Sequence, residues 1–179
     1  TGAQGGLTVA SAAFEHVCEG LERRTGLDRL QCRGTVRLIL KEAGLTVYHV
    51  VPTLAAALKA VDAGVDGLVV EGGEGGGFKS PTPVATMVLL PLVRSKVDVP
   101  IIAAGGITDG YTMAAAFALG AEGVQMGTRM VTAAESPVHA NWKQAIVDAG
   151  ETDTLFLNER HSPALRALRT GRTTRLWDS

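Results

Sequence analysis

The chain has 179 residues, enough for one domain with a sizeable core but fewer than the roughly 250 that a closed (β/α)₈ barrel usually contains. Its 17 basic and 18 acidic residues give a formal net charge of −1, which argues against a nucleic-acid-binding surface. No apolar run is long enough to span a membrane, and no signal-peptide pattern opens the sequence. We therefore expect a soluble, cytoplasmic protein.

The N-terminal part predicts helices and no catalytic loop. Apolar residues recur at helical spacing over residues 9–24, and a second helix is expected over 36–43. We assign residues 1–35 to an N-terminal helical extension and residues 36–179 to the main domain. Cys18 and Cys32 form no metal-binding pattern and are interpreted as inert thiols in a reducing compartment.

From residue 46 onward, apolar strands alternate with amphipathic helices. One helix is expected to begin near Thr53, which is a suitable N-cap. Two further helices are expected over residues 86–96 and 109–119. The strands are expected at residues 46–51, 67–70, 100–104 and 123–126. Because these strands are apolar throughout, they predict an α/β fold with a parallel sheet covered by helices.

An internal repeat supports this alternation. Gly64 and Gly67 align with Gly120 and Gly123, because 120 − 64 and 123 − 67 both equal 56, so one repeat comprises two βα units. Asp66 and Glu122 occupy the equivalent helix-to-strand turns. Such turns generally serve stability in parallel βα folds, so we interpret both acids as packing residues.

The third and fourth strands each run into a glycine turn. Gly105 and Gly106 follow one strand, and Gly127 and Thr128 follow the other. Glycine leaves backbone N–H groups accessible at the ends of parallel strands, where the following helix also favours an anion. The pair of turns therefore predicts a phosphate-binding site.

A glycine-rich loop over residues 71–77 follows the second strand. With five glycines among seven residues, the loop is too flexible to stay ordered without a ligand or tight packing. The loop also carries Glu71 and Glu74, which we interpret as solvated or capping carboxylates rather than catalytic ones.

The C-terminal part predicts a helix over 137–147 and then an arginine-rich segment, interpreted as a solvated helix face or an interface, with phosphate binding as the alternative. Each of the histidines considered is interpreted as a surface or satisfied core residue. The arginines are Arg160, Arg166, Arg169, Arg172 and Arg175, and the histidines are His49, His139 and His161.

Taken together, the segments at residues 71–77, 99–107 and 120–129 resemble the nitronate monooxygenase family, also called 2-nitropropane dioxygenases. The family consists of FMN-dependent TIM-barrel enzymes related to flavin enoyl reductases. The resemblance covers residues 38–169 and corresponds to the C-terminal half of the family's chain. It implies that the parallel (β/α) units form the C-terminal half of a TIM barrel.

The resemblance also implies roles for individual residues. Gly105, Gly106, Gly127 and Thr128 would donate backbone N–H groups to the FMN phosphate, with a hydroxyl added by Thr128. The remaining cofactor-binding residues would contact the flavin or its ribityl chain, and these are Gly75, Gly76, Gly77 and Gln125. Gln125 is equally compatible with a polar position inside the barrel. No metal is implied.

The sequence departs from the family at two points. Phe78 stands where many members have the histidine that takes a proton from a nitroalkane, and the nearby Lys79 is flexible and usually charged, so no catalytic residue is assigned. The N-terminal half of the family is not recognisable before Leu38. Four parallel strands leave two open edges, so we expect a homo-oligomer or a companion chain that completes the barrel, or a truncated fragment.

We therefore expect an FMN-dependent oxidoreductase. It would oxidise a nitronate-type small-molecule substrate, or pass hydride from NADH or NADPH through flavin to an acceptor. The alternative is a noncatalytic or truncated half-barrel module that binds a phosphate-bearing ligand or a partner chain. A flavin-free phosphate-sugar enzyme shares the glycine turns but should show acid and base residues at its strand ends, and few are present.

Overall fold

The computed structural model describes residues 19, 23, 44–159 and 164–177, and it divides the chain into two compact units. One unit comprises residues 1–47 and 63–65, and the other comprises residues 48–62 and 66–179. In the first unit Glu19 and Arg23 are helical, and Arg23 Nε donates a hydrogen bond to the Glu19 carbonyl oxygen at 3.3 Å. Most of the predicted N-terminal extension, including both cysteines, lies outside the described residues.

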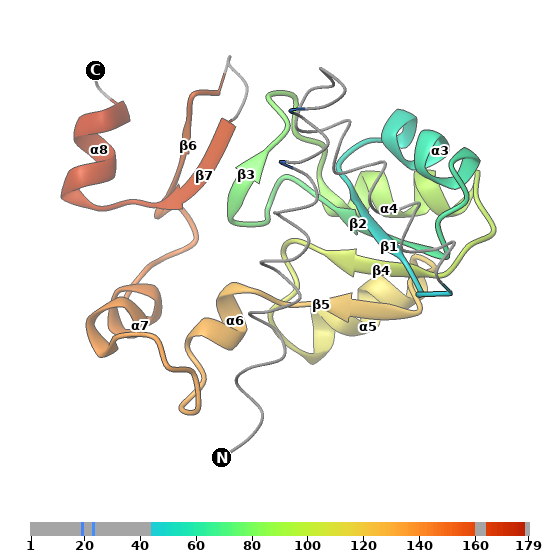
Figure 1. Ribbon diagram of the computed structural model, residues 1–179. Helices are drawn as coiled ribbons and strands as arrows, with labels where there is room; N and C mark the ends of the chain where they lie inside the picture. The colour runs from blue at the N-terminus through green and yellow to red at the C-terminus, as the bar shows by residue number, and fades with distance from the viewer. Residues whose placement is uncertain (1–18, 20–22, 24–43, 160–163, 178–179) are drawn as a thin grey trace. The chain divides into compact units, whose positions relative to one another are not determined.

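The second unit contains a four-stranded parallel sheet with the order β1-β2-β4-β5 (Figure 1). All four strands were predicted from the sequence, with ends that differ by one or two residues. They are β1 (Tyr48–Val51), β2 (Gly67–Glu71), β4 (Ile101–Ala104) and β5 (Gly123–Gln125).

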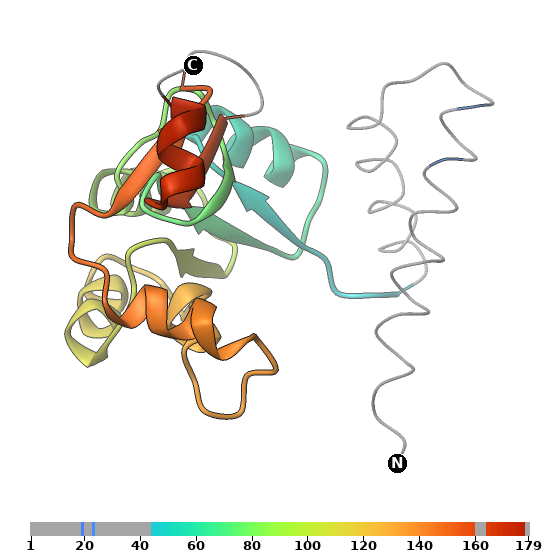
Figure 2. The same cartoon turned by 90° about the vertical axis from the view of Figure 1, so that its left-hand side faces the viewer.

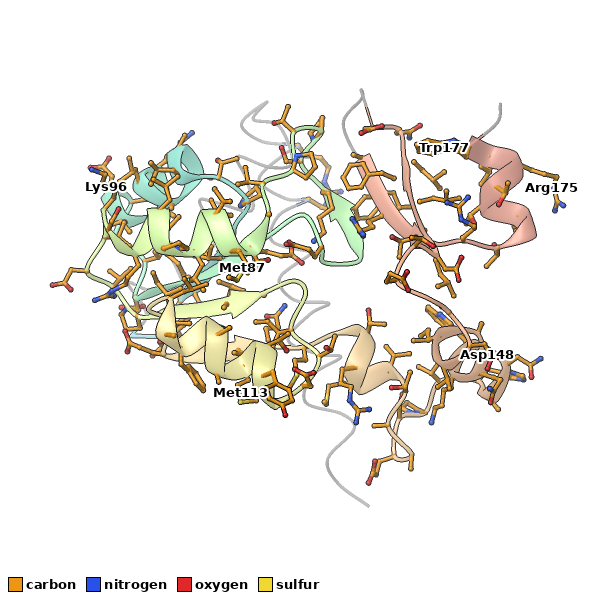
Figure 3. The ribbon with its side chains drawn as sticks, turned by 180° about the vertical axis from the view of Figure 1, so that it is seen from behind. Met87, Lys96, Met113, Asp148, Arg175 and Trp177 are labelled. Atoms are coloured by element: carbon orange, nitrogen blue, oxygen red, sulfur yellow. The ribbon has the colours of Figure 1, made fainter. Side chains whose placement is uncertain are left out.

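Helices connect these strands and pack on the sheet. They are α3 (Leu54–Asp62), α4 (Thr86–Arg94) and α5 (Gly110–Ala118). The α4 and α5 helices lie across the sheet in Figure 3, which views it from behind. The predicted cap at Thr53 is confirmed, since its Oγ1 accepts a hydrogen bond from the Ala56 N–H at 3.2 Å. None of the described helices is long and apolar enough to cross a membrane.

The two faces of the parallel sheet differ in burial. Successive side chains of a strand point to opposite faces, and register places Val51, Leu68, Val70, Ile101 and Ala103 on the same face. All five are completely buried. On the opposite face, Tyr48 and Val50 of the edge strand β1 are 39% and 45% exposed. The core therefore lies between the sheet and its helices.

A second, three-stranded sheet has the antiparallel order β3-β7-β6. It joins the end of the glycine loop to a C-terminal hairpin. The strands are β3 (Gly77–Lys79), β6 (Thr154–Leu157) and β7 (Ala164–Leu168). Three further helices are α6 (Thr128–Val131), α7 (Ala140–Val147) and α8 (Gly171–Trp177), and α8 contacts β6 (Figure 2).

This hairpin corrects the sequence analysis, which expected a helical C-terminal segment. The α7 helix lies within the predicted range 137–147, but β6 and β7 separate it from α8. The β7 strand owes its place to pairing with β3, a contact between distant parts of the sequence that no local pattern reports.

Candidate functional site

The two glycine turns lie at neighbouring strand ends. The β4 and β5 strands are parallel partners, with Ala104 opposite Gln125. The turn of Gly105 and Gly106 therefore leaves the same edge of the sheet as the segment of Gly127 and Thr128. This is the arrangement that the sequence predicted for the phosphate-binding site, although the ligand itself stays a prediction.

Backbone conformation explains the glycines of the first turn. Gly105 has φ +92° and Gly106 has φ +72°, a region that residues with a Cβ rarely adopt. A Cβ on Gly105 would also lie 3.1 Å from both the Gly72 carbonyl oxygen and the Gly75 nitrogen. The glycine loop and the turn are thus in close backbone contact.

Backbone donors are available at these strand ends. Within the described ranges, the N–H groups of Gly106, Gly127 and Thr128 donate no hydrogen bond. A Cβ built on Gly127 would meet no atom within 4 Å, so open space lies in front of it. The site therefore combines unused N–H groups with room for a ligand.

The starts of α4 and α5, in contrast, are already served by carboxylates. Glu74 accepts a hydrogen bond from the Thr86 N–H, at 3.0 Å to each of its carboxylate oxygens. Asp109 caps α5 by accepting from the Thr112 N–H at 2.8 Å. The N–H and hydroxyl of Thr112 hold the pKa of Asp109 below its ordinary value. Both helix starts thus carry their own anion.

Glu74 confirms the capping interpretation and also reveals a residue that the sequence analysis missed. Thr86 is only 7% exposed, and its Oγ1 lies 2.8 Å from Glu74 Oε2 and 3.0 Å from the Gly105 carbonyl oxygen. A threonine at a helix start is too common a pattern to single out. Only the folded chain brings it to the glycine turn.

A cavity of about 120 Å³ lies beside this cluster. Most of its lining is apolar, and the Glu74 carboxylate and Thr112 provide polar atoms. Gly105 and Gly106 contribute to it, whereas Gln125, Gly127 and Phe78 do not. The lining residues are Glu74, Thr86, Met87, Leu90, Gly105, Gly106, Ile107, Thr112, Ala115, Ala116 and Leu119.

The glycine loop is held at its far end by an ion pair. Lys79 Nζ lies 2.6 Å from Glu71 Oε1, and the Lys79 side chain is only 3% exposed. This corrects the expectation of a flexible Lys79 and identifies Glu71 as its partner rather than as a solvated acid. Tight packing, one of the two conditions set by the sequence analysis, therefore orders the loop.

Phe78 and Lys79 do not share a surface. They are consecutive residues of β3, so their side chains point to opposite faces of that strand. Phe78 is 73% exposed. If substrate contacts Phe78, the Lys79 ammonium is directed away from it and does not replace the missing histidine as a base.

The other predicted flavin contacts lie in accessible positions. A Cβ on Gly76 would meet no atom within 4 Å, and Gly77 begins β3 with φ +86°. Gln125 is the exposed last residue of β5. Gly75 is enclosed instead, because a Cβ there would meet Lys79 Nζ at 2.6 Å and Glu71 Oε1 at 2.7 Å.

The described members of the arginine-rich segment do not share one helix face, which corrects that part of the interpretation, whereas the interface stays a prediction. Arg166, on β7, donates to Thr154 Oγ1 at 2.9 Å and to the Gly73 carbonyl oxygen at 3.4 Å. Arg169 pairs with Asp153 at 4.0 Å. Arg172 and Arg175 belong to α8, where Figure 3 labels Arg175 near Trp177. Arg160 lies outside the described residues.

Two further predictions concern side chains outside the two glycine turns that follow β4 and β5. Glu122 lies 3.8 Å from Arg94 Nη1, and the same guanidinium donates to the Val99 carbonyl oxygen, in keeping with a packing turn. His139 is the N-cap residue of α7, and its Nδ1 accepts a hydrogen bond from the Asn141 N–H at 3.1 Å. His161 is outside the described residues.

Comparison with known proteins decides the family. The nitronate monooxygenase family profile matches residues 33–178, which is most of the chain. The chain belongs to the nitronate monooxygenase family. The resemblance inferred from the three glycine-containing segments is thereby confirmed.

Two curated relatives and one solved structure illustrate the match. The chain is 42% identical over 131 residues to (3aS,4S,5R,7aS)-5-hydroxy-7a-methyl-1-oxo-octahydro-1H-indene-4-carboxyl-CoA dehydrogenase of Rhodococcus jostii, covering 73% of this chain and 36% of that protein. It is 37% identical over 128 residues to a probable nitronate monooxygenase of Staphylococcus saprophyticus, covering 66% and 36%. FabK from Thermotoga maritima superposes with a TM-score of 0.73 and 45% identity, covering 76% and 43%.

The chain thus spans little more than a third of the length of these curated relatives. Over that length it confirms the fold prediction, because its parallel (β/α) units match part of the TIM barrel of these enzymes.

Proposed function

We propose that this chain carries the phosphate-binding part of an FMN-dependent oxidoreductase. The enzyme oxidises a nitronate-type substrate, or passes hydride from NADH or NADPH through flavin to an acceptor. The observation that carries the proposal is the pair of neighbouring strand ends with unused N–H groups, in a chain that belongs to the nitronate monooxygenase family.

The residues present fit a phosphate group. Gly106, Gly127 and Thr128 offer backbone N–H groups, and the space in front of Gly127 is open. The Glu74 carboxylate near Gly106 accepts a hydrogen bond from the Thr86 N–H and is held at the start of α4. When bound there, FMN supplies the hydride and electron chemistry that side chains lack.

In this proposal the protein positions the cofactor and shapes the substrate side. Gly76, Gly77 and Gln125 are exposed or unobstructed and would lie along the flavin or its ribityl chain. Phe78, which follows Gly77 in β3, presents an exposed apolar ring. Because Phe78 accepts no proton, a substrate that is already anionic, or hydride transfer from a nicotinamide, suits the site better than a neutral nitroalkane.

A coenzyme A thioester is a second candidate substrate class. It is supported by the 42% identity to a relative whose name specifies a carboxyl-CoA substrate. The exposed ring of Phe78 and the exposed arginines of α8 are compatible with an acyl chain and with phosphate groups, respectively. Enzyme assays with a nitronate, with an acyl-CoA and with each nicotinamide would rank these candidates.

Association with further strands is part of the proposal. The β1 and β5 strands are the edges of the parallel sheet, and Tyr48 and Val50 are exposed on the face away from the helices. A second copy or a companion chain would cover this face and complete the barrel. A molar mass in solution equal to that of one chain, together with full flavin binding, would contradict this association.

The decisive experiment compares two glycines that both have open space around them. Gly127→Val puts a side chain at the proposed phosphate position, whereas Gly110→Val puts the same side chain at the start of α5. We expect FMN binding, measured by quenching of flavin fluorescence, to weaken at least about tenfold for Gly127→Val and to change little for Gly110→Val.

Two results would contradict the proposal. One is parental flavin affinity in Gly127→Val, and the other is a wild-type protein that takes up no FMN. A colourless protein would favour the noncatalytic half-barrel module. A flavin absorption band that bleaches when NADH or NADPH is added would favour the enzyme.

A further inference from the structure

Three segments that are separate in the sequence meet at Thr86. The glycine loop contributes Glu74, α4 begins at Thr86 itself, and β4 contributes the carbonyl groups of Ala104 and Gly105. Thr86 Oγ1 lies 2.8 Å from Glu74 Oε2, 3.3 Å from the Ala104 oxygen and 3.0 Å from the Gly105 oxygen. One buried side chain therefore lies against both the loop and the turn.

The hydrogen bonds at Thr86 have defined donors and acceptors. The Thr86 N–H donates to the Glu74 carboxylate, and the hydroxyl offers one further proton to Glu74 or to the Gly105 carbonyl. Bonds to a carboxylate are stronger than bonds between neutral groups. Removal of Glu74 would leave the buried Thr86 N–H without this acceptor, so the contact resists separation.

Two glycines make the close approach sterically feasible. A Cβ on Gly72 would clash with Thr86 Oγ1 and would lie 2.5 Å from Glu74 Oε2. A Cβ on Gly105 would lie 3.1 Å from Thr86 Oγ1. The absence of a side chain at Gly72 and at Gly105 therefore leaves space for the Glu74 carboxylate and the Thr86 hydroxyl.

We propose that Glu74 and Thr86 are positioning residues that couple the glycine loop to the Gly105–Gly106 turn. A structural change in the loop at residues 72–77 is transmitted through these two side chains to the turn at residues 104–107. A change in the turn is transmitted to the loop in the same way. The coupling does not depend on which ligand the turn holds. Only its consequence for flavin binding rests on the proposed function.

Hydrogen exchange, followed by mass spectrometry on the full chain, tests the coupling without any ligand. We compare wild type with Glu74→Ala, Thr86→Val and Thr86→Ser. Thr82→Val serves as the control, because Thr82 is exposed and its hydrogen bonds among the described residues go to neighbouring Ser80. We expect Glu74→Ala and Thr86→Val each to accelerate exchange about tenfold or more in both segments, whereas Thr86→Ser retains the hydroxyl and stays near wild type.

The double variant Glu74→Ala/Thr86→Val makes the test sharper. If the two side chains act as one unit, its exchange exceeds that of the faster single variant by less than about threefold. Effects that multiply, or faster exchange in only the segment that carries the substitution, would overturn the proposal. If Glu74→Ala does not fold, Glu74→Met, which retains the side-chain length and removes both acceptor oxygens, replaces it under the same criteria.

Flavin titration adds a second readout. We expect FMN to bind at least about tenfold more weakly to Thr86→Val, and within about threefold of wild type to Thr86→Ser. If wild type itself binds no FMN, the proposed function fails while the exchange result still decides the coupling. If Thr86→Val binds FMN as wild type does, the coupling has no role in cofactor binding and that part of the proposal is overturned.

Discussion

The parallel sheet and the antiparallel sheet of this chain are built on different principles. In the parallel sheet, β4 and all of β2 except its last residue are apolar, and Leu68, Val70 and Ile101 are completely buried against helices. In the antiparallel sheet, β3 has three residues, of which Gly77 and Phe78 are exposed. Local apolar pattern makes the first sheet, whereas the second depends on a few specific contacts.

Those specific contacts are mostly polar. Lys79 pairs with Glu71, and the Arg166 guanidinium donates to both Thr154 and the Gly73 carbonyl. The ion pair attaches β3 to β2 of the parallel sheet, and the Arg166 contacts attach β7 to the glycine loop and to β6. The difference teaches that buried apolar side chains hold the parallel sheet, whereas a few polar contacts hold the glycine loop.

Core truncation should give the largest effect and the sharpest contrast between the sheets. Leu68→Ala removes a completely buried side chain, and we expect a loss of about 3 kcal/mol of unfolding free energy. Leu157→Ala, in half-buried β6, should cost about 1 kcal/mol. Urea unfolding measures both, and equal losses would mean that the two sheets share one kind of core.

Breaking the Lys79–Glu71 ion pair should have the next largest effect. Lys79→Ala leaves the Glu71 carboxylate, whose side chain is 23% exposed, without its cation, and we expect a loss of about 2 kcal/mol. Lys59→Ala, at an exposed position of α3, is the matched control and should change stability by less than about 0.5 kcal/mol. Similar values for the two lysines would show that the ion pair does not hold the loop.

Two alanine substitutions in the glycine loop should behave oppositely. Gly72→Ala places a Cβ against Thr86 Oγ1, so we expect it to cost about 1.5 kcal/mol. Gly76→Ala meets no atom within 4 Å and should be neutral or slightly stabilising, because alanine restricts the unfolded chain. Thermal unfolding separates the two, and an equal loss at Gly76 would mean that flexibility rather than space requires the glycines.

The smallest effect concerns pH and the start of α5. The folded pKa of Asp109 lies below its ordinary value of 3.8, so its stabilising contribution is present above that value and is lost as pH falls through the folded pKa. Asp109→Asn removes the titration. We therefore expect the stability difference between wild type and this variant to shrink below about pH 4. A difference independent of pH would contradict the role of the charge.

The sequence predicted the parallel sheet because each of its parts carries a local signal. The strands are short apolar runs, the cap at Thr53 is a side chain beside its own helix, and the turn at Gly105 and Gly106 is a pair of consecutive glycines. The same signals located the candidate phosphate-binding ends of β4 and β5. The three glycine-containing segments likewise indicated the family, which the family profile confirms.

The rest of the site depends on partners far apart in the chain. Thr86 looks like any residue at a helix start until β4 brings the Gly105 carbonyl beside it. Lys79 reads as a mobile surface cation until Glu71 and the glycine loop enclose it. Arg166 reads as part of a basic helix until β7 pairs with β3. Each assignment requires a contact that spans the loop or joins two sheets.

The sequence by itself thus determined the alternation of strands and helices, the glycine turns and the family. These features follow from the periodicity of apolar residues and from the conformational freedom of glycine within a short stretch of chain. The tertiary structure alone decided how the glycine loop is held and which polar side chains reach the turn. Charged and hydroxyl groups acquire their role from the atoms they meet, and those atoms come from other segments of the folded chain.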